Sequence, residues 1–461
     1  MSERIQNRLS RRSFLRMTAV AGGLGLAAAC AAPGAPAADT GDGAAPSGEM
    51  VDLRLSAWAD VQDAVVYDNM VNAFMAANDD LNVTVEQYPG GYYQKIQANF
   101  AGNTSADILY YQGWQFQSYA ENGVLAPLDD FIAATDSGDK FPRNENYDSM
   151  TQWDGSTYMT PTDTGPLVIY YNKDIFDAKG VAYPAAGWTW DEFKSTIETL
   201  SFEEGDSKTY GWAQAAGWNG SYGRCANFMR RNGHVEWDTI IEPTEARWDH
   251  EDVISGLQFV VYDTIANGWS PGPDVIAGGG VGVDTGRVAM VLEGPWFMPR
   301  LFGELATTEE GINFDVALAP VGVDDTNYTF GHVHGHCITS PSEHKDEAWR
   351  VVDFILSDEG QAIIANGGRL CGTPRNIENL WAPIASETYN FENTGAFVNS
   401  MAEGATPVVF GEGSELHAYG GAAITSLWDK LLGLQETADT AVKTANEEIQ
   451  GALDRYHAER A

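Results

Sequence analysis

Alternating polar and apolar residues mark the first predicted element of the chain. Residues 51–58 alternate with a period of two, which is typical of a strand with one buried face. Apolar residues then recur at helical spacing between positions 61 and 78, and the alternation returns over 82–88. A strand, a helix and a strand in this order predict a β-α-β unit, whose parallel strands place ligand sites at their carboxyl ends.

The alternation of helix and strand patterns continues after this unit. Helical spacing covers residues 92–101, and a third strand is expected over 106–111. That strand runs into the turn Gln112-Gly113-Trp114. The repeated change between the two periods predicts an α/β fold class.

Two later segments have the pattern of crossings between separate parts of the molecule. The turn-rich run 161–166 leads into the apolar and aromatic residues 167–171, which predicts a crossing that opens a strand. Residues 314–320 have the pattern of a return crossing, and a further strand is expected over 331–340. Helical patterns then dominate the rest of the chain.

The length and charge of the chain limit what it can be. With 461 residues it is too long for one core of ordinary size, so at least two lobes are expected. Its 27 Lys and Arg against 65 Asp and Glu give a net charge of −38, and the acidity is spread along the sequence. Binding a phosphate backbone requires a basic stripe, and the sequence has none, so nucleic acid is not an expected partner.

The N-terminal residues 1–29 have the pattern of an export signal. The pair Arg11-Arg12 precedes a short, weakly apolar segment and resembles a twin-arginine signal. A membrane-spanning helix needs roughly 20 apolar residues, so this segment is too short for a permanent anchor. It ends in what resembles a lipoprotein cleavage site with Cys30 as the lipidated residue, and ordinary secretory cleavage after Ala29 is the alternative. Residues 30–50 are rich in Ala, Pro, Gly and Ser and are expected to form a flexible tether.

A series of short motifs in a set order carries a family resemblance. The motifs are Trp58, Tyr88, Ser105-Ala106-Asp107-Ile108, Gly123-Val124-Leu125-Ala126-Pro127-Leu128, Tyr170-Tyr171-Asn172-Lys173-Asp174, Trp188-Thr189-Trp190-Asp191-Glu192-Phe193 and Gly286-Arg287-Val288-Ala289-Met290. With these motifs, the chain from about residue 51 onwards resembles the family-1 extracellular solute-binding proteins of ABC importers, which include sugar-binding lipoproteins similar to maltose-binding protein. The resemblance implies a two-lobed periplasmic-binding-protein fold of type II, with a sugar held in a cleft between two α/β lobes that close on it.

The two crossings set the expected bounds of the lobes. The first lobe is expected to comprise residues 51–163 and 318–357, and the second lobe residues 164–317 and 358–461. Each lobe is then large enough to bury a core of its own.

Aromatic residues recur where strands are expected to end, and this pattern provides the candidate ligand site. Sugars present apolar C–H faces and a rim of hydroxyls, so their sites combine Trp or Tyr rings with carboxylate and amide side chains. In the family pattern, aromatic and amide contacts follow the first and third strands, and a stacking Trp follows a Gly-Pro turn. The candidate ligand-binding residues are Trp58, Tyr88, Gln112, Trp114, Asp163, Trp218, Tyr222, Glu293, Trp296 and His332.

Other chemistries have weaker signals. The sequence lacks G-x-S-x-G, P-loop and His-Glu-x-x-His motifs, so neither an enzyme nor a cofactor is expected. Residues 331–337 place three histidines on one face of a strand. His332 and His336 are too far apart to bind the same zinc ion, so no metal site is predicted. A zinc ion bound by two neighbouring histidines and a ligand distant in sequence stays an alternative. Cys225, Cys337 and Cys371 allow at most one disulfide.

The predicted function is that of the carbohydrate-binding subunit of an ABC transporter. The protein is expected to be a monomer, held at the extracytoplasmic face of the cell membrane by its N-terminal lipid. It would capture a mono- or oligosaccharide by lobe closure and deliver it to the permease. One alternative is a binding protein for a polyol or a glycerol phosphate, for which Arg369 and Arg375 are the suggestive cations. An exported carbohydrate-active enzyme is the less favoured alternative.

Overall fold

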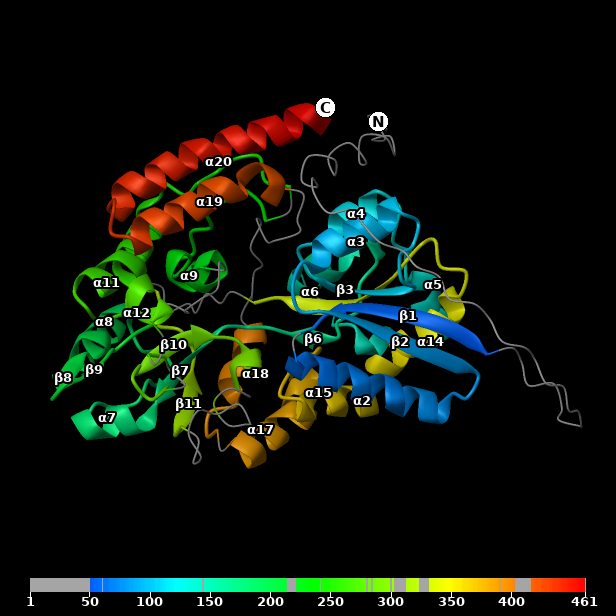
Figure 1. Cartoon of the computed structure of the whole chain (residues 1–461), viewed down its shortest axis with the longest axis horizontal. Coiled ribbons are helices and arrows are strands. Elements are labelled where there is room, and N and C mark those ends of the chain that lie inside the picture. The colour runs from blue at the N-terminus through cyan, green and yellow to red at the C-terminus, as the bar shows by residue number, and fades with distance from the viewer. Residues whose placement is uncertain are drawn as a thin grey trace, which may run out of the picture.

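The computed structural model shows two lobes, each built on its own sheet (Figure 1). It describes residues 50–59, 61–142, 145–213, 221–240, 242–278, 281–282, 285–298, 301, 312–322, 331–389, 391–402 and 416–460. The predicted export signal and Cys30 therefore lie outside the described residues, as does nearly all of the predicted tether. Within the described part of the chain, no helix is both long enough and apolar enough to cross a membrane.

The first lobe is organised around a six-stranded sheet with the strand order β13-β6-β12-β3-β1-β2. Its strands are β1 (Val51–Trp58), β2 (Leu81–Tyr88), β3 (Ile108–Gln112), β6 (Asp163–Thr164), β12 (Val333–Ile338) and β13 (Leu370–Cys371). Strand β1 pairs in parallel with β2 and with β3, which confirms the predicted β-α-β unit. Strand β12 runs antiparallel to both β3 and β6, so the returning chain is inserted into the middle of this sheet.

Helices cover both faces of the first sheet. They are α2 (Val61–Ala77), α3 (Tyr92–Ala101), α4 (Gln117–Glu121), α5 (Asp129–Ala134), α6 (Glu145–Thr151), α14 (Lys345–Ile355) and α15 (Asp358–Asn366), with a short helical turn at Gly138–Lys140 and the hairpin of β4 (Gln152–Trp153) and β5 (Ser156–Thr157). The sheet buries Leu55 and Ile108 completely, and α2 adds Phe74 at 2% exposure. This burial of alternate strand residues is the physical reason for the period of two in the sequence.

The second lobe has a three-stranded antiparallel sheet with the order β10-β7-β11. Its strands are β7 (Val168–Asn172), β10 (Met290–Glu293) and β11 (Phe314–Ala317), and β8 (Phe202–Glu204) pairs with β9 (Ser207–Thr209) in a separate hairpin. Its helices are α7 (Lys173–Lys179), α8 (Trp190–Thr199), α9 (Ser221–Met229), α10 (Glu251–Leu257), a π-helical segment (Gln258–Asp263), α11 (Thr264–Ala266), α12 (Pro273–Ala277), α19 (His417–Leu432) and α20 (Ala438–Arg460). A short 3-10 turn (Pro295–Phe297) follows β10.

Helix α8 shows how the sequence fixes one of these elements. The Thr189 hydroxyl accepts a hydrogen bond from the Glu192 backbone N–H, and the Glu192 carboxylate accepts one from the Thr189 backbone N–H at 2.6 Å. This reciprocal cap satisfies backbone donors that the first helical turn leaves open. Phe193 and Ile197, four residues apart, then bury one face of the helix in the second lobe.

One expected lobe boundary differs from the structure. Strand β13 pairs with β6, opposite Asp163 and Thr164, and helix α15 packs beside α2. Residues 358–371 therefore belong with the first lobe, although they were expected in the second. The reason is that the unpaired edge of the short strand β6 is completed by the chain that follows α15.

A helical segment below the sheets connects the two lobes for a third time (Figure 1). It contains α16 (Pro374–Asn376), a π-helical segment (Ile377–Trp381), α17 (Ala382–Tyr389) and α18 (Gly395–Ala402). The Trp381 and Phe397 rings lie 5.0 Å apart, and Phe397 lies 6.2 Å from Tyr170 of β7. This segment therefore packs against β7 of the second lobe, before α19 and α20 complete that lobe.

Candidate ligand-binding site

One edge of the first sheet carries several of the predicted aromatic and amide residues. Trp58 and Tyr88 end the paired strands β1 and β2 opposite one another, and both side chains are half-buried. Gln112 ends β3, and its Oε1 accepts a hydrogen bond from the Tyr93 hydroxyl at 3.1 Å. Because parallel strands end at the same edge, the sequence could place these residues together without knowledge of the sheet.

Trp114, His332 and Trp296 meet between the two lobes. Trp114 follows β3 in the first lobe, and its ring packs edge-on against His332 with centroids 4.8 Å apart. Trp296 follows β10 in the second lobe and stacks on His332, with centroids 5.8 Å apart and an angle of 20° between the planes. His332 lies on the segment that returns to the first lobe, immediately before β12. One imidazole therefore contacts an indole from each lobe.

Gly165 lies under this aromatic contact, in the crossing between β6 and β7. A Cβ atom at this position would overlap the imidazole of His332 and would lie 2.9 Å from Cζ3 of Trp296. The backbone of the crossing can therefore approach both rings only because residue 165 has no side chain. From the sequence, Gly165 was expected in the crossing and at its hinge, and nothing in the pattern indicated this close approach to two rings.

Glu293 holds a buried ion pair beside Trp296. Its Oε1 accepts from Arg224 Nε at 3.0 Å and its Oε2 from an Arg224 terminal nitrogen at 2.7 Å. The Trp296 indole N–H also donates to Oε2 at 3.1 Å. Both charged side chains are less than 9% exposed. Glu293 thus orients the indole, and the bidentate pair fixes both groups; nothing in the sequence pattern pointed to Arg224.

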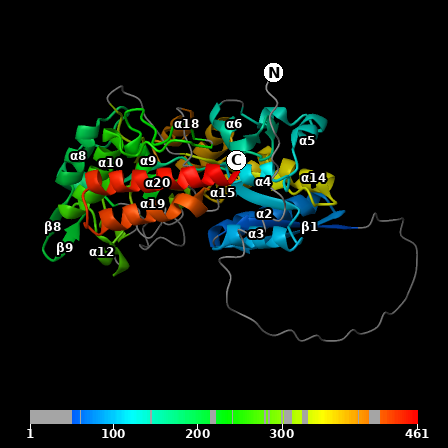
Figure 2. The same ribbon diagram turned by 90° about the horizontal axis from the view of Figure 1, so that it is seen from above.

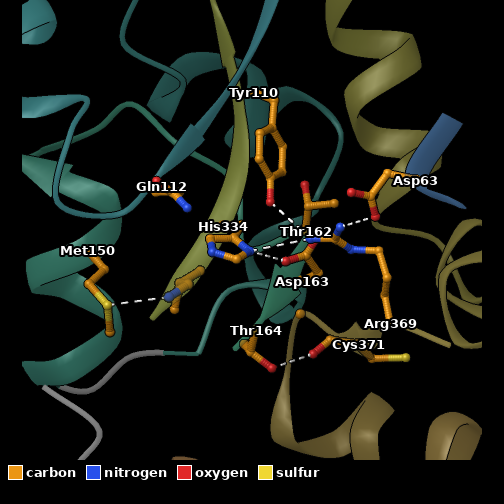
Figure 3. A network of polar contacts seen from close by, with 12 residues as sticks. Asp63, Tyr110, Gln112, Met150, Thr162, Asp163, Thr164, His334, Arg369 and Cys371 are labelled. Carbon is orange, nitrogen blue, oxygen red and sulfur yellow. Dashed lines mark hydrogen bonds and ion pairs between the residues drawn. The ribbon is translucent and has the colours of Figure 1, made fainter. Parts of the chain in front are cut away.

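Asp163 belongs to a second buried network, shown in Figure 3. Its Oδ1 lies 2.5 Å from His334 Nδ1, and its Oδ2 accepts from Arg369 Nε at 3.1 Å. Arg369 also forms an ion pair with Asp63 of α2 and donates to the Tyr110 hydroxyl at 3.1 Å. Burial alone would raise the pKa of Asp163, but Arg369 and His334 hold that pKa below its ordinary value. The network joins both crossing strands, β6 and β12, to the body of the first lobe.

His332, just before β12, and His336, within it, differ in their surroundings. Burial lowers the pKa of His332 well below its ordinary value, and electrostatic interactions with His334, Arg369 and Arg224 lower it further. Burial also lowers the pKa of His336 to about 4, and Nδ1 of this ring lies 2.7 Å from the Thr162 hydroxyl. His332 and His336 are therefore neutral at pH 7. In the described chain, no group of three or more His, Cys, Asp or Glu side chains is arranged to hold a metal ion.

The structure does not bring every predicted residue to this region. Tyr222 lies on α9 in the core of the second lobe, where its hydroxyl contacts Glu236 and accepts from the Trp237 indole at 2.6 Å. Its side chain is 4% exposed. Trp218 lies outside the described residues. Cys225, Cys337 and Cys371 are all free thiols.

Gln115 is a buried polar residue that the sequence pattern did not single out. It follows Trp114 directly and is 1% exposed. Among the described residues, neither atom of its side-chain amide has a hydrogen-bond partner. A buried amide without partners costs about 1–3 kcal/mol, so such a group calls for an explanation in function.

A cavity of about 540 Å³ lies on another part of the first lobe. Its lining includes Lys140, Ser357, Thr373 and Arg375 but no aromatic side chain. None of the predicted ligand-binding residues contributes to it. A site suited to a sugar would combine aromatic rings with polar groups, so the aromatic cluster at His332 is the stronger candidate.

Comparisons with known proteins agree with this architecture. The sequence model of the bacterial extracellular solute-binding proteins matches residues 58–362, about two thirds of the chain. A binding protein of Brucella abortus (strain 2308) is 23% identical over 316 residues, which cover 64% of this chain and 69% of that protein. The sn-glycerol-3-phosphate-binding periplasmic protein UgpB of Escherichia coli (strain K12) is 26% identical over 191 residues, covering 38% of this chain and 42% of that protein.

Solved structures with low sequence identity share the fold. An ABC substrate-binding protein from Listeria monocytogenes in complex with cycloalternan has a TM-score of 0.73 at 22% identity, covering 88% of this chain and 99% of that one. The sugar-binding protein MalE from Xanthomonas citri has a TM-score of 0.71 at 18% identity, covering 89% of this chain and 100% of that one. These matches confirm the predicted two-lobed periplasmic-binding-protein architecture. The chain belongs to the family of bacterial extracellular solute-binding proteins.

Proposed function

We propose that this protein is the extracytoplasmic carbohydrate-binding subunit of an ABC importer. It captures a mono- or oligosaccharide between its lobes and delivers it to a membrane permease. The observation that carries the proposal is the meeting of Trp114 and Trp296, one from each lobe, at the neutral His332. Flat indole rings suit the apolar C–H faces of a sugar. The Listeria monocytogenes protein is in complex with cycloalternan, and the Xanthomonas citri protein is named a sugar-binding protein; both support this ligand class.

The charges around the indoles favour a neutral ligand. The Arg224 guanidinium is paired with Glu293, and the Arg369 guanidinium with Asp63 and Asp163. A phosphate group binds best to cations whose charge is not already balanced by carboxylates. We therefore favour a saccharide over the glycerol phosphate named for UgpB, whose match covers a smaller part of this chain.

Amide and carboxylate side chains supply the expected polar contacts to the sugar. Gln112 and Gln115 flank the Trp114 turn, and a ligand hydroxyl can both donate to and accept from a side-chain amide. Glu293 contributes by orienting the Trp296 indole, whose N–H donates to its carboxylate. Asp163 acts indirectly, because both of its oxygens are bound to His334 and Arg369. Trp58 and Tyr88 extend the same sheet edge toward a longer ligand.

Closure of the lobes couples binding to transport. The crossing near Gly165 and the return crossing over 318–320 are the proposed hinges, since each joins a strand of one lobe to a strand of the other. A ligand that contacts Trp114 and Trp296 together can do so only when the lobes are close. Its binding energy therefore shifts the population toward the closed state.

We also propose a lipid anchor and twin-arginine export for this extracellular family member. The support is the Arg11-Arg12 pair and Cys30 at the end of the signal-like segment. Cys30→Ser should release the protein from the membrane fraction or leave the precursor uncleaved. Replacing both arginines with lysine should retain the precursor in the cytoplasm. Unchanged membrane association or normal export of these variants would contradict the respective assignment.

A thermal-shift screen against mono- and oligosaccharides tests the proposed ligand class. A ligand present at 100 times its dissociation constant stabilises a protein by about 2.7 kcal/mol, which is a readily measured shift. Glycerol 3-phosphate is included as the anionic competitor. Stabilisation by glycerol 3-phosphate and by none of the saccharides would overturn the proposal.

Substitution of Trp296 then tests the location of the site. Trp296→Ala should weaken the saccharide found in the screen by at least tenfold, because a buried aromatic contact at a binding interface is worth about 2–4 kcal/mol. Trp190→Ala is the matched control, since Trp190 is a half-buried indole of the same lobe that packs on Phe228 and Phe259. Calorimetric titration measures the saccharide affinity of both variants and so tests whether the ligand contacts Trp296. Equal affinities for the two variants would place the ligand elsewhere.

A further inference from the structure

An ion pair joins the end of helix α20 to the opposite lobe. Arg460 of α20 contacts the carboxylate of Glu121, the last residue of α4. Helix α20 packs on α19 and α10 in the second lobe, whereas α4 follows β3 in the first. Figures 1 and 2 both show α20 running from the second lobe toward α4. The contact therefore bridges the two lobes on the side where α3 and α4 lie.

Contacts within α20 orient the Arg460 side chain toward Glu121. Its guanidinium lies 4.8 Å from the centre of the Tyr456 ring, one turn earlier, and Tyr456 is 5% exposed. Such a cation–π contact limits the rotamers of a long side chain, so less entropy is lost when the ion pair forms. A positive charge in the last turn of a 23-residue helix is also favoured by the helix dipole. The Arg460 side chain is 15% exposed, so solvent screens it only in part.

We infer that Glu121 and Arg460 form an interlobe clasp that stabilises the closed state before any ligand contributes. Every other contact of α20 described above lies within the second lobe, so opening the lobes would break this ion pair without disturbing the helix. The clasp would raise the closed population of the free protein, and hence the apparent affinity of a ligand that binds the closed form. Its effect on affinity rests on the proposed binding function, but its effect on lobe closure does not.

The size of the effect follows from the exposure of the pair. Partly exposed ion pairs contribute modestly, so loss of the clasp should lower the ratio of closed to open molecules by about two- to fivefold. Salt screens such a pair, because the Debye length falls to roughly 3 Å at 1 M ionic strength. High salt should therefore bring the wild-type ratio close to that of a variant without the clasp.

Interlobe distances in the ligand-free chain provide the test. Single-molecule energy transfer is measured between dyes on Asp139→Cys in the first lobe and Glu204→Cys in the second, in a chain that also carries Cys30→Ser. Both labelling positions are exposed, and Cys225, Cys337 and Cys371 are buried. Glu121→Gln and Arg460→Gln should each lower the closed-to-open ratio two- to fivefold. Arg455→Gln is the matched control, because it removes the same charge from an exposed position of the same helix.

Exchanging the two charges distinguishes an effect of the ion pair from separate effects of Glu121 and Arg460. The double variant Glu121→Arg with Arg460→Glu should restore most of the closed population. An unchanged ratio in both single variants, or a charge exchange that restores nothing, would overturn the clasp. Because no ligand is present, a chain that passes this test but binds no saccharide would refute the proposed function and leave the clasp standing.

Discussion

The buried histidines His332 and His336, just before and within β12, give a quantitative prediction for stability in acid. His336 has no exposed surface, and burial lowers its pKa from an ordinary 6.5 to about 4. A histidine with a lowered native pKa stays neutral in the folded protein but takes up a proton in the unfolded chain below about pH 6.5. Its contribution is therefore complete at neutral pH and is lost as the pH falls from about 6.5 to about 4. His332, whose pKa burial also lowers, acts in the same direction.

The magnitude for His336 follows from these two pKa values. Between pH 7 and pH 5 the unfolded chain gains about 0.7 of a proton at this residue and the folded protein only about 0.1, and integration over this range removes about 2 kcal/mol of stability. Asp163 adds little in this window, because its lowered pKa moves its effect to below about pH 4. Burial raises the pKa of Asp315, so this carboxyl group makes the folded protein more stable as the pH falls, opposite to His336. The contributions of Asp163 and Asp315 cancel when a His336 variant is compared with the wild type, because both proteins contain them.

Urea unfolding at pH 7, 6 and 5 measures the effect, with tryptophan fluorescence and far-UV circular dichroism as parallel probes. In His336→Asn the loss of stability between pH 7 and pH 5 should be about 2 kcal/mol smaller than in the wild type. An asparagine amide can occupy the position of Nδ1, which lies 2.7 Å from the Thr162 hydroxyl. His344→Asn, at the half-buried N-cap of α14, is the control and should keep the wild-type loss. An equal loss in His336→Asn and the wild type would refute the reasoning.

Two substitutions, one in the first crossing and one beside it, test the packing and the charges of the site. Gly165→Ala should destabilise the protein by about 1–3 kcal/mol and weaken saccharide binding at least tenfold, because the added methyl overlaps the ring of His332; wild-type affinity in a calorimetric titration would contradict this. Arg369→Met should cost about 3–5 kcal/mol in urea unfolding at pH 7, since it leaves Asp63 and Asp163 as buried carboxylates without their cation. The exposed pair of Arg350 is the control, and Arg350→Met should cost under about 1 kcal/mol. Equal costs would show that the buried network does not hold the crossings.

Local periodicity in the sequence was sufficient for the first lobe. The alternation over 51–58 and 82–88 predicted the paired strands β1 and β2, because apolar residues two positions apart enter one core: Leu53, Leu55 and Ala57 from β1, and Leu81 and Val83 from β2. The sheet edge with Trp58, Tyr88 and Gln112 followed from that pattern alone. In contrast, β13 has only two residues, so it was assigned to the wrong lobe. A pairing that short leaves no periodic signal.

Most contacts at the site could not be predicted, because the interacting side chains are far apart in the sequence. Asp163 and Glu293 were both expected to bond a sugar, but their ion-pair partners are 206 and 69 residues away. The sequence shows that a carboxylate is present and gives no indication of which cation will be folded against it. Whether such a group binds a ligand or an arginine depends on tertiary packing.

Tyr222 is a different case, because a signal was present in the sequence. Residues 222, 225, 226 and 229 are all buried, and their spacing is that of one face of a helix. Helical periodicity therefore places Tyr222 on the core side of α9. Tyr222 was instead expected in a loop, because the family resemblance places second-lobe ligand contacts there; the structure follows the helical periodicity.

The arrangement at His332 also explains which contacts can change when the lobes separate. Asp163 and His334 lie on neighbouring strands of one sheet, so their contact at 2.5 Å can persist in an open molecule. The indoles of Trp114 and Trp296 reach His332 from different lobes, so a rotation about the crossings must part at least one of them from the imidazole. In the proposed closing motion, the charged network stays intact beside the proposed hinge, while the aromatic contacts form only on closure. A ligand that replaces those aromatic contacts acts on the open-to-closed equilibrium without having to break a buried ion pair.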